Sequence, residues 1–417
     1  MTMTLLCDRI LFVLLCLMMF FLPATNAFVK VAASVAILVF FFKRGSLGWA
    51  AFRELPVKWV LLPAVLYFGW SGLSIIWSQF PLLSLKGFIG KSLYAMFLFF
   101  ISYETLSSRK RYGILIGVFL VSAGIISLDG LWQAFSGYDI FVRATFNSGR
   151  VMASFKHPND FGAYLILVLL PAIMLMIMAG ARSLIEYTLK NALLAFGGIF
   201  FVGIASAALG LTYSRGAWLG MVVAVVVFIL FNRRFWPVVL AFMALFIVVF
   251  QPLLLKVRDV SLVSDAVMEQ EKILSFNGNG RLTFWHDAIN IIKDNPVLGT
   301  GLNTYTMVIK KYVTMWAIYP HNCYLQMGAE LGLVGLALFL WFLTAIIVQV
   351  SFLIRRLPQA PERWLLAAFF AGWCGFLVHS GLDTTLYSSQ LTAIFWVLTG
   401  AMAAFGKQSL GGCDGSK

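Results

Sequence analysis

Three arginines and one histidine are the residues of this chain best suited to chemistry: Arg143, Arg215, Arg281 and His321. A guanidinium group can hold two oxygens of one phosphate through paired N–H donors. A histidine gains and loses a proton near neutral pH, so it can remove a proton from a hydroxyl group. Together these residue types predict a site for an anionic substrate.

The elements that must position these residues are membrane-spanning helices. Of the 417 residues, 61% are hydrophobic and only 12% are charged, whereas a soluble protein of this size carries about 25% charge. The apolar residues lie in runs of roughly 17 to 25, the length of a helix that crosses a bilayer. The sequence predicts an all-α polytopic membrane protein with about 12 transmembrane helices. The predicted spans cover residues 5–24, 27–42, 58–77, 87–102, 112–132, 160–179, 193–211, 216–231, 235–254, 324–354, 365–382 and 388–405.

The basic residues of the short loops orient these spans. Every second loop is rich in lysine and arginine, as in Lys43-Arg44, Arg109-Lys110-Arg111 and Arg233-Arg234. Because basic loops stay on the cytoplasmic side, both termini are expected there, and the four residues named first share the opposite face. A channel would instead spread such residues along a pore. The net charge of +14 reflects this topology and anionic lipid headgroups, and it gives poor support for nucleic-acid binding.

The chain is expected to divide into residues 1–254 with nine spans, a periplasmic loop at 255–320, three spans in 321–405 and a cytoplasmic tail at 406–417. We expect the first segment to stay as a helix rather than be cleaved as a signal peptide, because it is long and another span follows at once. The five cysteines lack metal-type spacing, so no disulfide, metal or cofactor is expected.

The long loop carries a helical pattern. Asn279 suits the N-cap of this helix and Asn295-Pro296 suits its end. The Gly299-Thr300-Gly301 segment that follows is expected to be a flexible turn. The apolar residues that recur at helical spacing, and predict an amphipathic helix at the membrane surface, are Leu282, Trp285, Ile289 and Ile292.

Two charged residues near the spans each have two interpretations. Glu330 lies nine residues after His321, about 13 Å along a helix, and either joins the site or hydrogen-bonds a neighbouring helix. Arg215 lies between two spans and either grips phosphate oxygens or reaches lipid headgroups. The GxxxG pairs that predict close helix packing are Gly216 with Gly220 and Gly328 with Gly332.

Other polar residues at the outer ends of spans are further candidates for direct roles in the site. His157 opens the sixth span, where Asp160 suits the N-cap. His379 and Asp383 bracket the outer end of the eleventh span and are candidates of the same kind.

Four motifs stand on the outer side: His157-Pro158-Asn159, Ser214-Arg215-Gly216, Arg281…Trp285…Pro296…Gly299-x-Gly301, and His321-Asn322-x-x-Leu325…Glu330-x-Gly332-x-x-Gly335. Their order, spacing and sidedness resemble the O-antigen ligase and polymerase family over about residues 140–390. The resemblance implies a metal-independent glycosyltransferase of the bacterial inner membrane whose active face is periplasmic. Its donor would be a glycan on undecaprenyl diphosphate. The family's loop histidine and outer arginines correspond to His321, Arg215 and Arg281.

The acceptor stays open within that family. Ligases pass the glycan to a sugar of the lipid A core, polymerases pass it to another lipid-linked repeat, and relatives glycosylate proteins. Ligase-type transfer is preferred here over polymerisation. Membrane lipids are the remaining expected partners.

The same residues fit this reaction on chemical grounds. Breaking a sugar–diphosphate bond develops negative charge, which guanidinium groups at Arg215 and Arg281 would stabilise. His321 would act as general base on the acceptor hydroxyl or bind phosphate as a cation.

Arg143, His157 and Glu330 are further candidates for substrate binding. Two interpretations from other classes stay open. A transporter or flippase for lipid-linked glycans would show similar halves and charged residues near mid-bilayer, and a structural scaffold would leave Arg215 unexplained.

Overall fold

The computed structural model describes residues 2–47, 58–106, 108–143, 149–237, 241, 244, 280–312 and 319–411. Every regular element among them is a helix, and seven helices are long and apolar enough to cross a membrane, with three shorter apolar helices besides. The prediction of an all-α protein with several membrane-spanning helices is therefore confirmed. Most of the ninth predicted span, 235–254, and much of the predicted loop lie outside the described residues, as does the N-cap predicted at Asn279.

The helices have the following bounds. The N-terminal half holds α1 (Thr2–Phe21), α2 (Asn26–Leu47), α4 (Lys58–Leu73), α5 (Pro81–Gly87), the π-helix η1 (Phe88–Leu93), α6 (Tyr94–Thr105), α7 (Arg109–Ser136), α8 (Pro158–Glu186) and α9 (Leu189–Leu211). The C-terminal half holds α10 (Arg215–Phe231), η2 (Arg233–Phe235), α13 (Gly280–Asp294), α14 (Tyr305–Val308), η4 (Ile309–Lys311), α15 (Cys323–Arg356), α16 (Pro361–Ser380), η5 (Thr385–Tyr387) and α17 (Ser389–Gly411).

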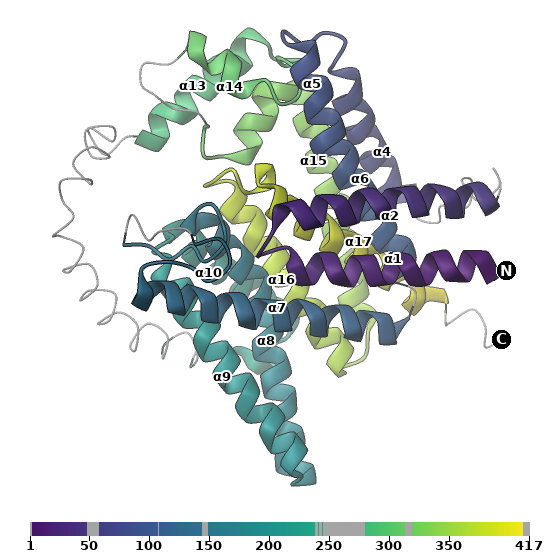
Figure 1. The fold of residues 1–417 in the computed structure, drawn as a ribbon, viewed down its shortest axis with the longest axis vertical. Helices are drawn as coiled ribbons and strands as arrows, with labels where there is room; N and C mark the ends of the chain where they lie inside the picture. Colours follow the sequence, from purple (N-terminus) through teal and green to yellow (C-terminus); the bar gives the residue numbers. More distant parts are fainter. Residues whose placement is uncertain are drawn as a thin grey trace.

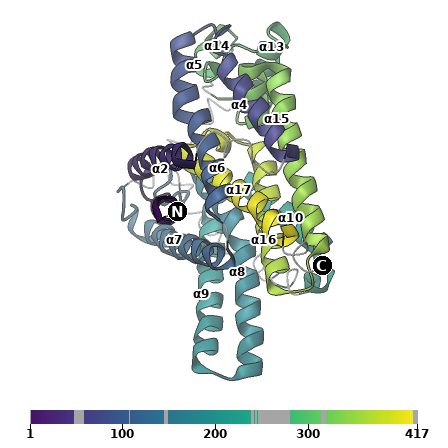
Figure 2. The same cartoon turned by 90° about the vertical axis from the view of Figure 1, so that its right-hand side faces the viewer.

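The arrangement centres on α16. Figure 1 shows α1, α2 and α7 running alongside one another, while the α8–α9 hairpin projects from the body. Figure 2 shows the same hairpin at one extremity and α4, α5 and α15 at the other. Helix α16 packs closely on both α8 and α10. Its Trp373 is fully buried, stacks on Phe395 with ring centroids 5.6 Å apart, and donates a hydrogen bond to Thr399.

Local signals set several helix starts. Ser214 caps α10 by accepting from the N–H of Ala217, and Asn322 caps α15 by accepting from two backbone N–H groups. Asp160 was predicted as the N-cap of its span, which is wrong. The helix begins earlier, at Pro158 with His157 as N-cap, because proline suits the first helical position.

The first GxxxG pair packs helices as predicted. A side chain added at Gly216 would meet the ring of His379, and one added at Gly220 would meet the backbone of Gly375 on α16. The absence of these side chains lets α10 and α16 approach closely.

The two glycines of the second GxxxG pair behave differently: Gly328 packs against Ile292 of α13, as predicted, whereas Gly332 does not serve helix packing. Gly332 breaks α15, with φ 69° and ψ 178°, a backbone conformation open to glycine. The loop after α13 crosses this break, where Leu333 N–H donates to the Pro296 carbonyl and Gly301 N–H donates to that of Glu330, both at 2.8 Å. The Gly299-Thr300-Gly301 segment is thus a clamped turn rather than a flexible one.

Helix α13 is confirmed as a helix. It packs inward through Ala288 and Ile291, which contact α14 and η4. Two residues of the predicted apolar stripe, Leu282 and Ile289, are exposed instead. Contact of that stripe with a membrane surface stays a prediction.

Charged residues gather at one end of the bundle into what we call the ion network: Asp8, Lys43, Arg44, Glu104 and Arg111. Lys43 pairs with Asp8 and Glu104, Arg44 pairs with Glu104, and Arg111 lies 3.7 Å from Asp8. The network joins α1, α2, α6 and α7. At the opposite end of the bundle α8, α10 and α15 begin and α16 ends, and the candidate site lies there.

Candidate functional site

A histidine–aspartate pair forms the centre of the candidate site. The Nδ1 atom of His321 lies 3.0 Å from Oδ1 of Asp383. His321 directly precedes the cap of α15, and Asp383 follows α16, so two helix ends bring the residues together. The side chain of His321 is 42% exposed and that of Asp383 only 10%. The imidazole of His321 is therefore accessible from outside the protein, and the carboxylate of Asp383 is buried beneath it.

Asp383 is held as an anion by several donors. Burial by itself raises the pKa of this carboxyl, but the hydrogen bond and charge of His321, with the N–H of Thr384, outweigh burial and lower the pKa well below its usual range. Because the folded-state pKa is lowered, the stability that Asp383 contributes is present at neutral pH. It is lost only when the pH falls through that lowered value.

The second oxygen of Asp383 connects to a longer network. The side-chain amide of Asn159 donates to Oδ2 of Asp383, and Arg150 donates to the amide oxygen of Asn159 at 2.8 Å. Arg150 also donates to the carbonyl of Thr212 at 2.9 Å. The His321 network, as we call residues His321, Asp383, Asn159, Arg150 and His379, thus ties the start of α8 to the end of α9.

His379 completes this network on α16. Its Nε2 lies 3.2 Å from the carbonyl oxygen of Asn159, and its ring packs against Gly216 at the start of α10. His379 is buried, whereas His321 is half-exposed. The geometry therefore gives His379 a packing position behind the site.

Two arginines stand beside the network. Arg215 is the first residue of α10, directly before the glycine that contacts His379, and its side chain is exposed. Arg281 lies in the first turn of α13, near enough for its charge to act on His379. From the same turn, the ring of Phe284 lies 6.1 Å from that of His321. Among the described residues, neither arginine has a hydrogen-bonding or ion-pair partner.

Helix geometry adds to the positive potential at Arg215. The N–H groups of the first turn of α10 and the helix dipole favour an anion at this position. Two features therefore favour an anion at this position, the charge of Arg215 and the helix N-terminus on which it lies.

The structure does not bring the other predicted residues into the same cluster. Arg143 is exposed at the end of a described segment, with φ 55°. His157 is the exposed N-cap of α8, two residues from Asn159, and makes no capping hydrogen bond. Their roles in binding substrate stay predictions.

Glu330 is fully occupied within the protein. Its carboxylate accepts from the backbone N–H groups of Asn303 and Tyr305 and from the side-chain amide of Gln326, at 2.8, 3.3 and 3.2 Å. This geometry matches the alternative interpretation, in which Glu330 holds neighbouring elements together.

Sequence reasoning missed Arg150 and the part played by Asn159. A signal for both existed: Arg150 lies shortly before the His157-Pro158-Asn159 motif, and Asn159 belongs to that motif. Across the described residues, no group of three or more His, Cys, Asp and Glu side chains is placed to hold a metal ion.

Two comparisons with known proteins show which proteins parts of the chain resemble. Residues 200–340 match the family described as O-antigen ligase, and this segment contains Arg215, Arg281 and His321. A stretch of 81 residues is 37% identical to a protein of Rickettsia bellii (strain RML369-C) that is named as a polysaccharide ligase. That stretch covers 17% of this chain and 20% of the relative. The resemblance predicted from the motifs is confirmed over this part of the chain.

Proposed function

We propose that this chain, which matches the O-antigen ligase family over residues 200–340, is a membrane glycosyltransferase. It would transfer a glycan from undecaprenyl diphosphate to the hydroxyl of an acceptor sugar. The observation that carries the proposal is the half-exposed His321, backed by anionic Asp383, beside two arginines for which the described residues supply no hydrogen-bonding or ion-pair partner.

The reaction exchanges one bond for another. The acceptor oxygen attacks the anomeric carbon of the donor sugar, a new glycosidic bond forms, and the bond between sugar and diphosphate breaks. The acceptor proton passes to the exposed nitrogen of His321, while Asp383 orients the imidazole and stabilises its charged form. Arg215 and Arg281 hold the negative charge that develops on the departing lipid diphosphate.

The alternative role for His321 is that of a phosphate ligand. An imidazolium paired with Asp383 would bind diphosphate as a cation. The two roles differ in pH dependence, because a base works when neutral and a phosphate ligand works when protonated.

The acceptor we propose is a sugar of the lipid A core or a similar glycan, because the matching family is described as a ligase family. Joining of lipid-linked repeats is the alternative, and it uses the same donor and the same site residues. The site would face the periplasm from the inner membrane, with both chain termini in the cytoplasm.

The test uses the purified full chain, a polyprenyl-diphosphate-linked oligosaccharide and a core-type glycolipid acceptor. The expected result is a new glycosidic bond and release of polyprenyl diphosphate. Labelled donor that crosses a vesicle membrane without any new bond would identify a flippase instead. Reporter fusions after Ser46 and Gln359 should read cytoplasmic and one after Asn277 periplasmic, and a cytoplasmic signal at Asn277 would overturn the proposed orientation.

A further inference from the structure

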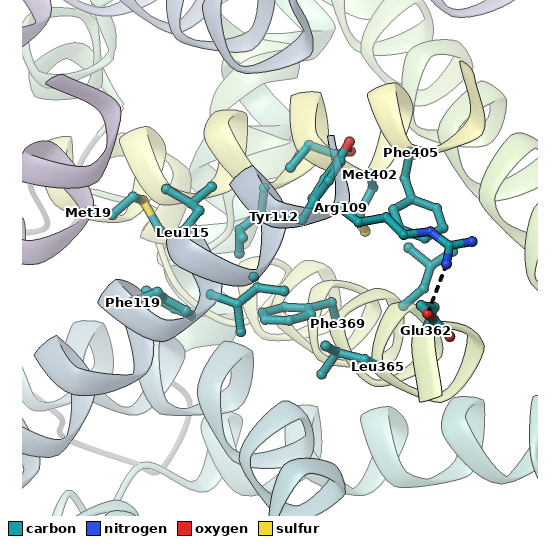
Figure 3. Close-up of a pocket in the computed structure, with 15 residues that line it drawn as sticks. Met19, Arg109, Tyr112, Leu115, Phe119, Glu362, Leu365, Phe369, Met402 and Phe405 are labelled. Carbon is teal, nitrogen blue, oxygen red and sulfur yellow. Dashed lines mark hydrogen bonds and ion pairs between the residues drawn. The ribbon is translucent and has the colours of Figure 1, made fainter. Parts of the chain in front are cut away.

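A second feature lies at the opposite end of the bundle from His321. An open cavity of about 270 Å³ is lined by residues of α1, α7, α16 and α17. Figure 3 shows Arg109 and Glu362 at one end of it, and Met19 and Phe119 at the other. The proposed glycan transfer makes no use of this cavity.

The walls of the cavity are apolar, with Leu115, Phe369 and Met402 among the residues that form them. The hydroxyl of Tyr112, which also lines it, already donates to the Ala401 carbonyl at 2.8 Å. A water molecule inside a protein needs two to four polar partners, which these walls do not offer. An apolar occupant is the one that matches them.

The depth of the cavity matches one leaflet of a bilayer. Arg109 and Phe119 are ten residues apart on α7, which corresponds to about 15 Å along the helix. The hydrocarbon core of a bilayer is about 30 Å thick, so one leaflet contributes about 15 Å. The cavity can therefore take a lipid chain from the helix ends to the bilayer centre.

The mouth of the cavity carries positive potential. Arg109 lies 3.3 Å from Glu362, and the two side chains are 81% and 42% exposed. This single contact leaves most of the five N–H donors of the guanidinium group available. Exposed Lys110 is adjacent in sequence, and α7 and α16 both begin at the mouth, where helix dipoles favour an anion.

We infer that the cavity binds one acyl chain of an anionic phospholipid, with the lipid phosphate at Arg109. The lipid comes from the leaflet at the Arg109 end. The chain would fill a void whose walls otherwise lack contacts on one side, and it would stabilise the packing of α7 against α16 and α17.

The first test fills the cavity. Native mass spectrometry would follow phosphatidylglycerol binding to the delipidated full chain in detergent. A Cβ at Gly113 or at Gly117 of α7 meets no atom within 4 Å, but only Gly113 lines the cavity. Gly113→Leu should weaken the first binding step about tenfold or more, corresponding to about 1.4 kcal/mol, and Gly117→Leu should leave it unchanged.

The second test addresses the headgroup. Phosphatidylglycerol should bind more tightly than phosphatidylcholine of the same chain length, and Arg109→Gln should reduce that preference about fivefold. Arg233, an exposed arginine outside the cavity, is the matched control, and Arg233→Gln should not change the preference.

A third measurement needs no variant. Phosphatidylglycerol with a photoreactive acyl chain should cross-link to α7 within residues 112–119. Cross-links found only elsewhere, or equal binding by Gly113→Leu and the parent, would overturn the inference. Tighter occupation of the cavity by a polyprenyl phosphate would overturn the phospholipid assignment and make the cavity part of the substrate path.

Discussion

The two ends of the helix bundle handle charge in opposite ways. In the ion network, each charged group meets an opposite charge inside the protein. At the His321 end, Arg215 and Arg281 have no partner among the described residues, while the one anion of the His321 network, Asp383, is already satisfied by His321 and Asn159. Charged side chains that pair with one another inside the protein stabilise the fold. Arginines that have no such partner, beside a carboxylate that is already paired, can bind an anionic ligand.

Among the variants that test this difference between the two ends, His321→Ala is expected to lower the rate of glycan transfer most. Loss of a general base lowers a rate by about 10² to 10⁴-fold, so the initial rate of glycan transfer by purified protein should fall by that much. The parent rate should also fall as the pH drops and the imidazole becomes protonated, and the variant should lose this dependence.

The control for His321→Ala is His286→Ala, because His286 is an exposed histidine on α13. An equal loss in both variants would contradict a special role for His321. Weak donor binding by His321→Ala, with an unchanged pH profile, would point to a phosphate ligand instead.

Arg215→Lys is expected to have the next largest effect. It keeps the charge and loses the paired N–H donors, and one charged hydrogen bond is worth about 1.5–3 kcal/mol. Transfer should therefore fall about 10- to 100-fold while the protein still accumulates in the membrane. Arg233→Lys, at the other end of the bundle, should retain nearly the parent rate. Parent-like transfer by Arg215→Lys would mean that Arg215 contacts lipid headgroups rather than donor phosphate.

Glu104→Gln tests the ion network, in which the charged side chains pair with one another. It removes the carboxylate that pairs with Lys43 and Arg44, both of which are buried. Breaking a buried pair from one side costs about 3–5 kcal/mol, so the melting temperature in detergent should drop while transfer per folded molecule stays the same. Glu362→Gln breaks an exposed pair and should cost about 0–1 kcal/mol. Equal destabilisation by the two changes would contradict a folding role for the buried ion network.

The smallest effect is expected from Arg143→Gln. Arg143 is exposed, and among the described residues no contact connects it to the His321 network. A change of no more than about fivefold in the transfer rate is expected, comparable to loss of one exposed charge contact. A loss as large as that from Arg215→Lys would place Arg143 among the main phosphate contacts.

Prediction from sequence succeeded where local pattern decides the structure. Apolar runs predicted most of the described helices, and the order of the motifs predicted the resemblance to the O-antigen ligase family over residues 200–340. It did not reach the link between Asn159 and Asp383, because these residues are 224 positions apart and meet only when α8 and α16 pack. The backbone partners of Glu330 at Asn303 and Tyr305 were equally out of reach, since that segment carries no periodic signal.

Gly332 shows a different limit. The GxxxG pattern at Gly328 and Gly332 is typical of helix packing, yet the second glycine breaks the helix because a loop backbone occupies the space. A GxxxG pattern indicates that no side chain fits at the two glycines. It does not indicate whether a helix or a loop packs against them.

The break at Gly332 also matters for the length of α15. An unbroken helix of 34 residues would be about 51 Å long, more than the entire thickness of about 40–45 Å for a bilayer with its headgroups. The part of α15 from Leu333 to Arg356 is about 36 Å long, which suits a hydrocarbon core of about 30 Å if the helix is modestly tilted. The short segment of α15 before the break then does not need to match the thickness of the hydrocarbon core. It can lie at its own angle, so the height of His321 above the lipid is set by the break rather than by the thickness of the membrane.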